Sequence, residues 1–239
     1  MYEKDYRVER YDTDTTGRLK PPVLTKMLSD IMERNADSYG AGADYHLSRN
    51  LAWVLVEYQL DIRRLPRADE IIAVGTLPYS FKKMYGFRIY SVKDSNGKPL
   101  IEGKGKFLLI DIKSKKMVKP DAEILDRFTD AKVEPVALPF EKWRLSADKP
   151  LHTIERRVTH DLIDINGHLN NAHSVTLAYE VMDPEYMADQ TTKSMYVRYR
   201  KEAFKDDKLS ITLYDEPGGY GVAITREGTV ISEVLFLKR

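Results

Sequence analysis

Three polar side chains of different chemistry alternate in one short stretch of the chain. Asp164, Asn166 and His168 are separated by single residues within the sequence Asp-Ile-Asn-Gly-His-Leu-Asn-Asn of residues 164–171. An extended backbone would place every second side chain on one face, so a carboxylate, an amide and an imidazole would project together. An imidazole titrates near neutral pH and can transfer a proton, and a nearby carboxylate can polarise it. The stretch is therefore a candidate catalytic centre.

The residues that follow predict the element that would position this centre. Apolar and small side chains recur at three- and four-residue spacing, which is typical of a helix over 171–182 with one buried face: Ala172, Val175, Ala178, Tyr179 and Met182. Free backbone N–H groups and the positive end of the helix dipole lie at a helix N-terminus and suit a developing oxyanion. A purely structural interpretation is the alternative, because Asn and Asp are also common helix caps and turn residues.

The composition excludes several classes of protein. The 239 residues include 38 basic and 37 acidic ones, so the basic excess typical of a dedicated nucleic-acid-binding protein is missing. The absence of cysteine excludes disulfides, thiolate metal sites and a cysteine nucleophile, and fits a reducing compartment. No run approaches the roughly 18 apolar residues of a membrane span, and the first residues show no targeting pattern. We expect a cytoplasmic protein without nucleic-acid or membrane partners.

The other histidines do not form a metal-binding pattern. His46, His152, His160 and His173 lack a second ligand at suitable spacing, apart from the common pair of His160 with the following aspartate. The sequence therefore predicts neither a metal nor another cofactor.

The first half of the chain predicts one long helix and an antiparallel sheet. A helix begins at the Pro21-Pro22 pair, continues through Leu24, Met27, Leu28, Ile31 and Met32 at helical spacing, and ends at Gly40 and Gly42. Strands are expected over 2–14, 51–65, 69–81, 84–93 and 100–112, with an Asn-Gly hairpin signal at 96–97. The connections between the later strands are too short for parallel crossovers.

The second half repeats this order after an irregular segment. A short helix over 121–128 and a proline-punctuated run end at Pro150. A strand over 151–161, the helix over 171–182 and strands over 193–201, 207–214, 220–226 and 229–237 follow. The succession of strand, helix and further strands indicates an internal duplication.

Comparing the halves residue by residue locates the chemistry. A shift of 164 − 14 = 150 places Asp14, Gly17 and Leu19 over Asp164, Gly167 and Leu169, each time before a helix. A second shift of 207 − 69 = 138 pairs Asp69 with Asp207 and places Arg64 opposite Glu202. The second copy thus has Asn166, His168 and Glu202 where the first has Thr16, Arg18 and Arg64. We expect any catalysis in the second half.

These features resemble a known enzyme family. The Asp-x-Asn-x-His-Leu-Asn-Asn segment at 164–171, followed about 30 residues later by Tyr-Arg-Lys-Glu at 199–202, is similar to the signature of the acyl-acyl carrier protein (acyl-ACP) thioesterases of plants and bacteria. The resemblance implies an α+β fold of two tandem hotdog domains, each a long helix packed on a curved antiparallel sheet. It implies an N-terminal domain at 1–128, a linker at 129–150 and a C-terminal catalytic domain at 151–239. Plant members often have cysteine after the glutamate, where this chain has Ala203, which argues against a cysteine nucleophile. Plant members also carry a plastid leader, whereas this sequence begins at its first predicted strand, so a bacterial member is expected.

The resemblance also implies roles for individual residues. Asp164, Asn166, His168 and Glu202 would be the catalytic set that hydrolyses a thioester. His168, partnered by Glu202, could activate water, or Glu202 could itself contact the water. Asn166 would orient the thioester or its oxyanion. Asp164 could orient its neighbours or attack as a nucleophile to form an anhydride.

Further residues would bind the substrate. The backbone N–H groups of Gly167 and Leu169 would help to stabilise the oxyanion, and Asn170 and Asn171 would contact the substrate. The first half would supply the acyl pocket, for which the candidates are Met27, Ile31 and Trp53. A place in the ordinary hydrophobic core is the alternative for these three.

The implied partner is acyl carrier protein, which presents its acyl group on 4′-phosphopantetheine. That partner is acidic, so basic clusters are candidate docking sites: residues 63–67, 82–83, 113–116 and 198–201. Two alternatives stay open at this stage, an acyl-coenzyme A thioesterase of the hotdog fold and a non-catalytic acyl-binding module. Two hotdogs in one chain are compatible with a monomer, a pseudo-dimer of hotdogs, or with a homodimer.

Overall fold

The computed structural model describes residues 1–128, 138–164, 167–183 and 192–238. Asn166, one of the candidate catalytic residues, lies outside these ranges, as does much of the expected linker. In the N-terminal half, β1 (Tyr2–Arg7) leads into α1 (Pro21–Ser38) and the short α2 (Ala43–Ser48). Four strands and a short helix follow, namely β2 (Leu51–Ile62), β3 (Ile71–Lys82), β4 (Tyr85–Asp94), β5 (Pro99–Asp111) and α3 (Ala122–Arg127).

The described residues of the C-terminal half show the same succession of a strand, a long helix and four further strands. It comprises β6 (Pro150–Arg157), α4 (Asn171–Glu180), β7 (Thr192–Tyr199), β8 (Lys208–Glu216), β9 (Gly219–Arg226) and β10 (Thr229–Lys238). The two strands predicted to run through 2–14 and 151–161 end earlier, because short 3-10 turns at Arg10–Asp12 and His160–Leu162 interrupt them.

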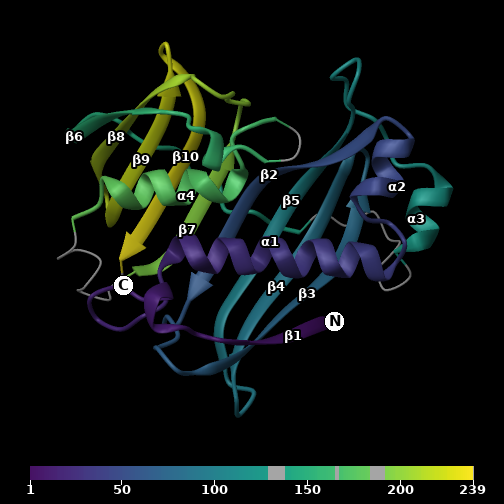
Figure 1. Cartoon of the computed structure of the whole chain (residues 1–239), viewed down its shortest axis with the longest axis horizontal. Helices are drawn as coiled ribbons and strands as arrows, with labels where there is room; N and C mark the ends of the chain where they lie inside the picture. Colours follow the sequence, from purple (N-terminus) through teal and green to yellow (C-terminus); the bar gives the residue numbers. More distant parts are fainter. Residues whose placement is uncertain (129–137, 165–166, 184–191, 239) are drawn as a thin grey trace.

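The ten strands form one antiparallel sheet in the order β1-β3-β4-β5-β2-β7-β10-β9-β8-β6. Counted inward from either edge, the order is the same, since β6, β8, β9, β10 and β7 correspond to β1, β3, β4, β5 and β2. The halves join where β2 pairs with β7, with Tyr58 opposite Val197. The sheet bends around α1 and α4, which pack against each other on one face (Figure 1). The expected α+β class, with one helix on an antiparallel sheet in each half, is confirmed.

Each helix packs its apolar stripe against the sheet. Leu24, Leu28 and Ile31 of α1 are fully buried, and Val175 and Ala178 of α4 are buried equally. Burying one such leucine or isoleucine contributes about 1.5–3 kcal/mol, so the spacing that predicts the helices also fixes which side meets the sheet. The described part of the linker packs on the opposite face, where Trp143 donates to Glu57 at 2.8 Å.

Backbone hydrogen bonds confirm the first repeat shift and correct the second. The bridge of Thr13 with Leu19 recurs as the bridge of Ile163 with Leu169, in agreement with the shift of 150. The bond from Asp69 N to Val8 O, 2.8 Å, recurs from Asp206 N to Val158 O at 2.9 Å. The second shift is therefore 206 − 69 = 137, and the expected 138 is wrong by one residue.

The error arises at two equivalent turns, one before β3 and one before β8. Asp69 and Asp206 have positive φ values of 66° and 73°, so they occupy the same special position of the two turns. Asp207 follows that position and matched Asp69 by residue type alone. With the corrected register, Glu202 corresponds to Leu65 and not to Arg64, since 202 − 137 = 65. The first copy thus has an apolar side chain where the second has its carboxylate.

Candidate active site

A tight turn carries His168 into the site. Gly167, with φ of 79°, donates its N–H to Asp164 O at 3.0 Å, and Asp164 N donates to His168 O at 2.9 Å. Positive φ costs glycine little, which accounts for Gly167 at this position. These bonds place Asp164 and His168 opposite each other, and Asn166, the middle residue of the predicted alternating trio, lies outside the described residues.

The side chain of Asp164 stabilises this turn. Its Oδ1 accepts a hydrogen bond from the backbone N–H of His168 at 3.3 Å. Asp14 in the first copy does the same for Arg18 at 3.2 Å and also accepts from Thr16 N at 2.8 Å. The copy without histidine keeps the aspartate and its bond, so a structural role is common to both aspartates.

His168 and Glu202 form the central pair of the site. His168 Nε2 lies 3.5 Å from Glu202 Oε2, and the two side chains are 25% and 41% exposed. Leu169 N donates to Ala203 O at 2.8 Å, which fixes the two segments to each other through their backbones. The imidazole also packs edge-on against Phe204, with ring centroids 5.1 Å apart. A histidine next to a carboxylate, partly open to solvent, can activate a water molecule.

Lys115 from the N-terminal half completes the charged group. Its Nζ lies 3.3 Å from Glu202 Oε1 and 3.5 Å from Oε2. The turn after β5 presents this lysine, and Asp111 stabilises the turn by accepting from Ser114 N at 2.7 Å. Sequence reasoning placed Lys115 only in a docking cluster, because no sequence pattern links it to a carboxylate 87 positions away.

The backbone donors expected for an oxyanion are engaged elsewhere. Gly167 N donates to Asp164 O at 3.0 Å and Leu169 N donates to Ala203 O at 2.8 Å. These bonds speak against the predicted oxyanion role of Gly167 and Leu169 in this conformation. The Asn166 amide stays a prediction.

Asn170 and Asn171 form the start of α4. The Asn170 side chain caps the helix by accepting from Ala172 N at 2.9 Å. The carbonyl of Asn171 accepts from the hydroxyl of Tyr199 at 3.1 Å. That bond joins the two segments of the sequence signature, and burial raises the pKa of Tyr199 well above its usual value, so the hydroxyl stays a donor. Contact of either asparagine with substrate remains a prediction.

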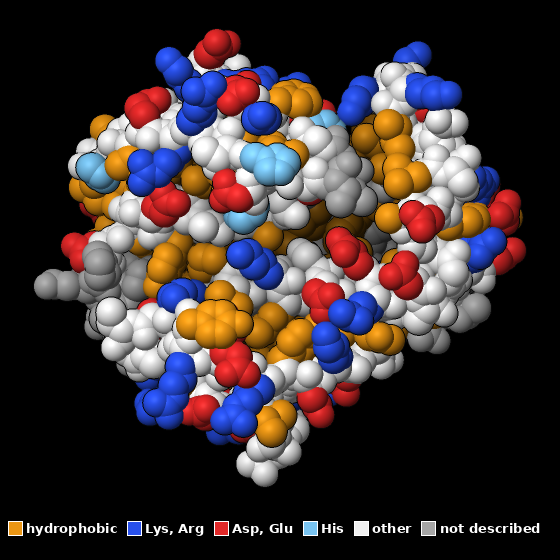
Figure 2. All heavy atoms as spheres, in the orientation of Figure 1, with side chains coloured by type: hydrophobic (Ala, Val, Ile, Leu, Met, Phe, Trp, Pro, Cys, Tyr) orange, Lys and Arg blue, Asp and Glu red, His pale blue; other side chains and the backbone are white. Residues whose placement is uncertain are grey.

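An apolar cavity of about 50 Å³ lies in the N-terminal half. Trp53, one of the three predicted pocket residues, lines it together with Met32 and Ala36 of α1. Met27 and Ile31 are buried in the main core between helix and sheet and do not line this cavity. On the face that carries the helices, the surface is hollowed beside α4 and above α1, and hydrophobic side chains show inside the hollow (Figure 2).

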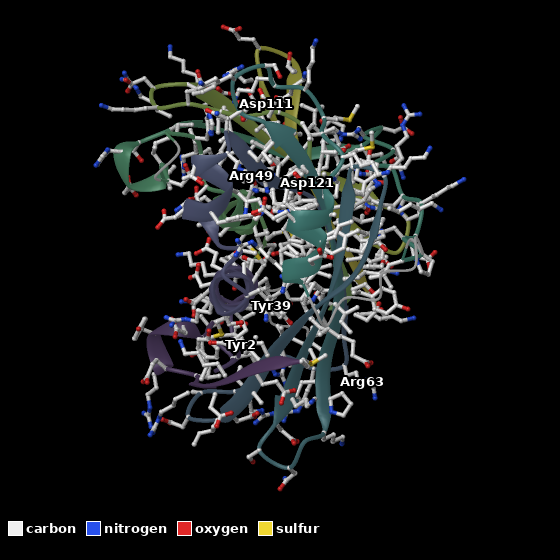
Figure 3. The ribbon with its side chains drawn as sticks, turned by 90° about the vertical axis from the view of Figure 1, so that its right-hand side faces the viewer. Tyr2, Tyr39, Arg49, Arg63, Asp111 and Asp121 are labelled. Atoms are coloured by element: carbon white, nitrogen blue, oxygen red, sulfur yellow. The ribbon has the colours of Figure 1, made fainter. Side chains whose placement is uncertain are left out.

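The outer wall of the cavity is held by the short helices. Phe128, which ends α3, lines the cavity and packs edge-on against Tyr39, with centroids 5.6 Å apart. Arg49, after α2, forms an ion pair of 2.5 Å with Asp121, the N-cap of α3 (Figure 3). This pair fastens α3 to α2 and so positions Phe128.

Two further observations bear on ions near the site. Among the described residues, no three His, Asp or Glu side chains are grouped closely enough to hold a metal ion. Burial and the negative charges of Asp30, Asp37 and Asp164 raise the pKa of Glu33 on α1.

Comparisons with known proteins decide the family. A model of the acyl-ACP thioesterase N-terminal domain matches residues 1–128, and a model of the C-terminal domain of the same enzymes matches residues 146–233. The chain belongs to the acyl-ACP thioesterase family. Among curated relatives of this family, a chloroplastic acyl-[acyl-carrier-protein] hydrolase of Cuphea viscosissima is 29% identical over 196 residues, which are 77% of this chain and 47% of the relative. The chain thus spans about half the length of that relative.

Solved structures of acyl-ACP thioesterases share the fold. An acyl-ACP thioesterase from Bacteroides thetaiotaomicron is 20% identical, with a TM-score of 0.87 over 99% of this chain and 97% of the other. The 12:0-ACP thioesterase from Umbellularia californica is 15% identical, with a TM-score of 0.88 over 100% of this chain and 96% of the other. At these identities the likeness establishes the tandem hotdog fold of the family, and the chemistry must be argued from the site.

Within the described chain, no helix is long and apolar enough to cross a bilayer.

Proposed function

We propose that this member of the family hydrolyses acyl-ACP to a free fatty acid and the carrier protein, in fatty acid biosynthesis. The observation that carries the proposal is the contact of His168 Nε2 with Glu202 Oε2, 3.5 Å, because it joins the two segments of the sequence signature in one partly open site. The family match over both halves supports the same conclusion.

Water is the nucleophile that this arrangement supports. His168 takes a proton from water while the water oxygen attacks the thioester carbon, and Glu202 stabilises the resulting imidazolium. The carbon–sulfur bond then breaks, and the proton on His168 passes to the leaving thiolate. Such general-base catalysis typically contributes about 10²–10⁴ in rate. Asp164 is the weaker candidate nucleophile, because its Oδ1 already accepts from His168 N.

The basic turn at Lys113 to Lys116 is the docking surface that the structure favours for the acidic carrier protein. It lies beside the site, since Lys115 contacts Glu202 at 3.3 Å. Among the described residues, one basic side chain of this turn, Lys115, forms an ion pair. Two other clusters each have two paired arginines: Arg63 with Glu102 and Arg64 with Glu70, and Arg198 with Glu57 and Arg200 with Glu233. An electrostatically guided encounter would be weakened by salt.

The proposed setting is a bacterial cytoplasm, which suits a sequence without cysteine. The pairing of β2 with β7 joins the two halves within one chain and supports a monomer. A mass measured in solution by light scattering tests this, and the mass of two chains would favour a homodimer.

The test of function is hydrolysis of a panel of acyl-ACP and acyl-coenzyme A thioesters by the wild type, His168→Ala and Glu202→Ala. His152→Ala is the matched control, because His152 is exposed on the edge strand β6. We expect kcat/KM on acyl-ACP to fall by about 10²–10⁴ in both site variants and to stay unchanged in the control. A folded His168→Ala protein with full activity would refute the proposed mechanism.

The same panel separates the alternatives. Higher kcat/KM on acyl-ACP, lost at high salt, supports the carrier-protein substrate. Equal or higher kcat/KM on acyl-coenzyme A would favour the coenzyme A thioesterase. Binding of acyl groups without turnover of any thioester would favour the acyl-binding module.

A further inference from the structure

A charged side chain lines the otherwise apolar cavity in the N-terminal half. Arg88 of β4 is only 6% exposed and faces the cavity together with Met32, Trp53, Phe81 and Phe107. Arginine is among the residues least often buried without a partner, because removal of its charge from water is costly. Its place in the wall of an otherwise apolar cavity therefore needs a physical reason.

The hydrogen bonds of Arg88 go to neutral groups. Its Nη1 donates to Asn35 Oδ1 of α1 at 2.6 Å and to Thr76 Oγ1 of β3 at 3.2 Å. Both of these hydrogen bonds come from Nη1, and in the part of the chain that the structure describes no carboxylate forms an ion pair with the guanidinium. Arg198, by contrast, is half-buried and pairs with the carboxylate of Glu57 at 3.5 Å.

Burial and the neighbouring tyrosines have opposite effects on the charge of Arg88. Burial lowers the pKa of Arg88, while the nearby Tyr90, Tyr58 and Tyr39 act in the opposite direction. A guanidinium has five N–H donors in a fixed plane, and Asn35 and Thr76 use only those on Nη1. The remaining donors can serve an oxygen atom that enters the cavity.

We propose that Arg88 is a specificity residue, which selects acyl chains that carry an oxygen acceptor remote from the thioester. A hydroxyl, a keto or a carboxylate oxygen shares the chemistry that a guanidinium recognises. This inference rests on the proposed function, since it concerns the acyl group of the same reaction. An unsubstituted chain leaves the donors without a partner, and a site that is built to bind an oxygen rejects the analogue that lacks it.

The size of the cavity is consistent with a wall that moves. A volume of about 50 Å³ is small beside the roughly 300–1,000 Å³ of most ligand pockets, so an acyl chain enters by displacing side chains. Met32 is the adaptable member of the wall, because its unbranched side chain has several rotatable bonds. Arg88 is fixed on β4 by its two hydrogen bonds and would keep its position.

The experiment compares carrier-protein thioesters of one chain length that differ only in the substituent: none, hydroxyl, keto or terminal carboxylate. We expect the wild type to show kcat/KM at least about tenfold higher for one oxygenated chain than for the plain chain. Arg88→Met, of similar length and without charge, should reduce this ratio to about one, while Arg88→Lys should retain part of it. Equal kcat/KM of the wild type on all four chains would overturn the proposal.

Two controls separate specificity from folding and from the proposed function. Thr76→Val removes one acceptor of Arg88 but leaves the guanidinium, so the ratio should persist; its loss in a folded Thr76→Val protein would count against a direct contact. Calorimetric binding of the corresponding free acids needs no turnover. A binding preference for the oxygenated acid in a protein that hydrolyses no thioester would refute the function and support the site. If Arg88→Met does not fold, the wild-type panel and the ratio measured for Arg88→Lys still test the proposal.

Discussion

Lys115 in the N-terminal half lies 3.3 Å from the carboxylate of Glu202 in the C-terminal half. The same carboxylate lies 3.5 Å from His168 Nε2, so one glutamate connects a fixed cation to the candidate general base. The described site is thus made by both halves, although its signature residues all come from the second.

Lys115→Met should lower the rate of the reaction, because it removes the cation that lies 3.3 Å from Glu202 Oε1 and holds this carboxylate next to His168. Because the pair is exposed, we expect kcat/KM at neutral pH to fall only about two- to fivefold. Steady-state kinetics of the wild type, Lys115→Met and Lys116→Met, a matched change in the same turn, check this. Unchanged kcat/KM in Lys115→Met would show that the lysine does not act on the pair.

Asp164→Asn should separate a structural role from a nucleophilic one. An amide oxygen can still accept the hydrogen bond from His168 N, so the activity of Asp164→Asn should stay within about tenfold of the wild type. Asp164→Ala removes the acceptor, so it should lose about 1 kcal/mol of stability and much more activity than Asp164→Asn. Asp14→Ala, the equivalent change in the first copy, should cost similar stability and leave kcat unchanged. Denaturant unfolding and steady-state kinetics on the same samples measure both. Complete loss of activity in a folded Asp164→Asn protein would favour attack by the carboxylate.

Asp30 on α1 should make the fold sensitive to acid. Burial opposes its ionisation, but hydrogen bonds from Arg34, Tyr6 and Lys4 outweigh burial and lower the pKa of Asp30 to about 2. A carboxyl with a lowered pKa in the folded state contributes stability above its unfolded value near 3.8, and this contribution disappears as pH falls toward 2. We expect a contribution of about 1 kcal/mol, because solvent screens side chains that are 39% exposed.

The measurement is the free energy of unfolding of the wild type and Asp30→Asn between pH 2 and pH 6. The difference between the two proteins should be largest near pH 6 and should shrink between about pH 4 and pH 2. A difference that does not depend on pH would mean that the pairs of Asp30 add nothing electrostatic.

The sequence alone determined the order of the helices and strands and the family to which the chain belongs. Helix periodicity around Leu24 and Val175 and strand alternation are local patterns, and each half repeats them, so the order of the elements and the α+β fold could be predicted. The signature around His168 and Glu202 was enough to indicate the family, because its residue types and spacing are themselves the pattern.

Only the tertiary structure decided how distant residues meet. It assigned Leu65, not Arg64, to the position of Glu202, because the register depends on a turn at Asp69 that residue identity does not reveal. It brought Lys115 to Glu202 and placed Arg88 inside a cavity. Long-range pairing across β2 and β7 and burial under α1 are collective results of packing, and no local spacing encodes which side chain from the other half of the chain will be the neighbour.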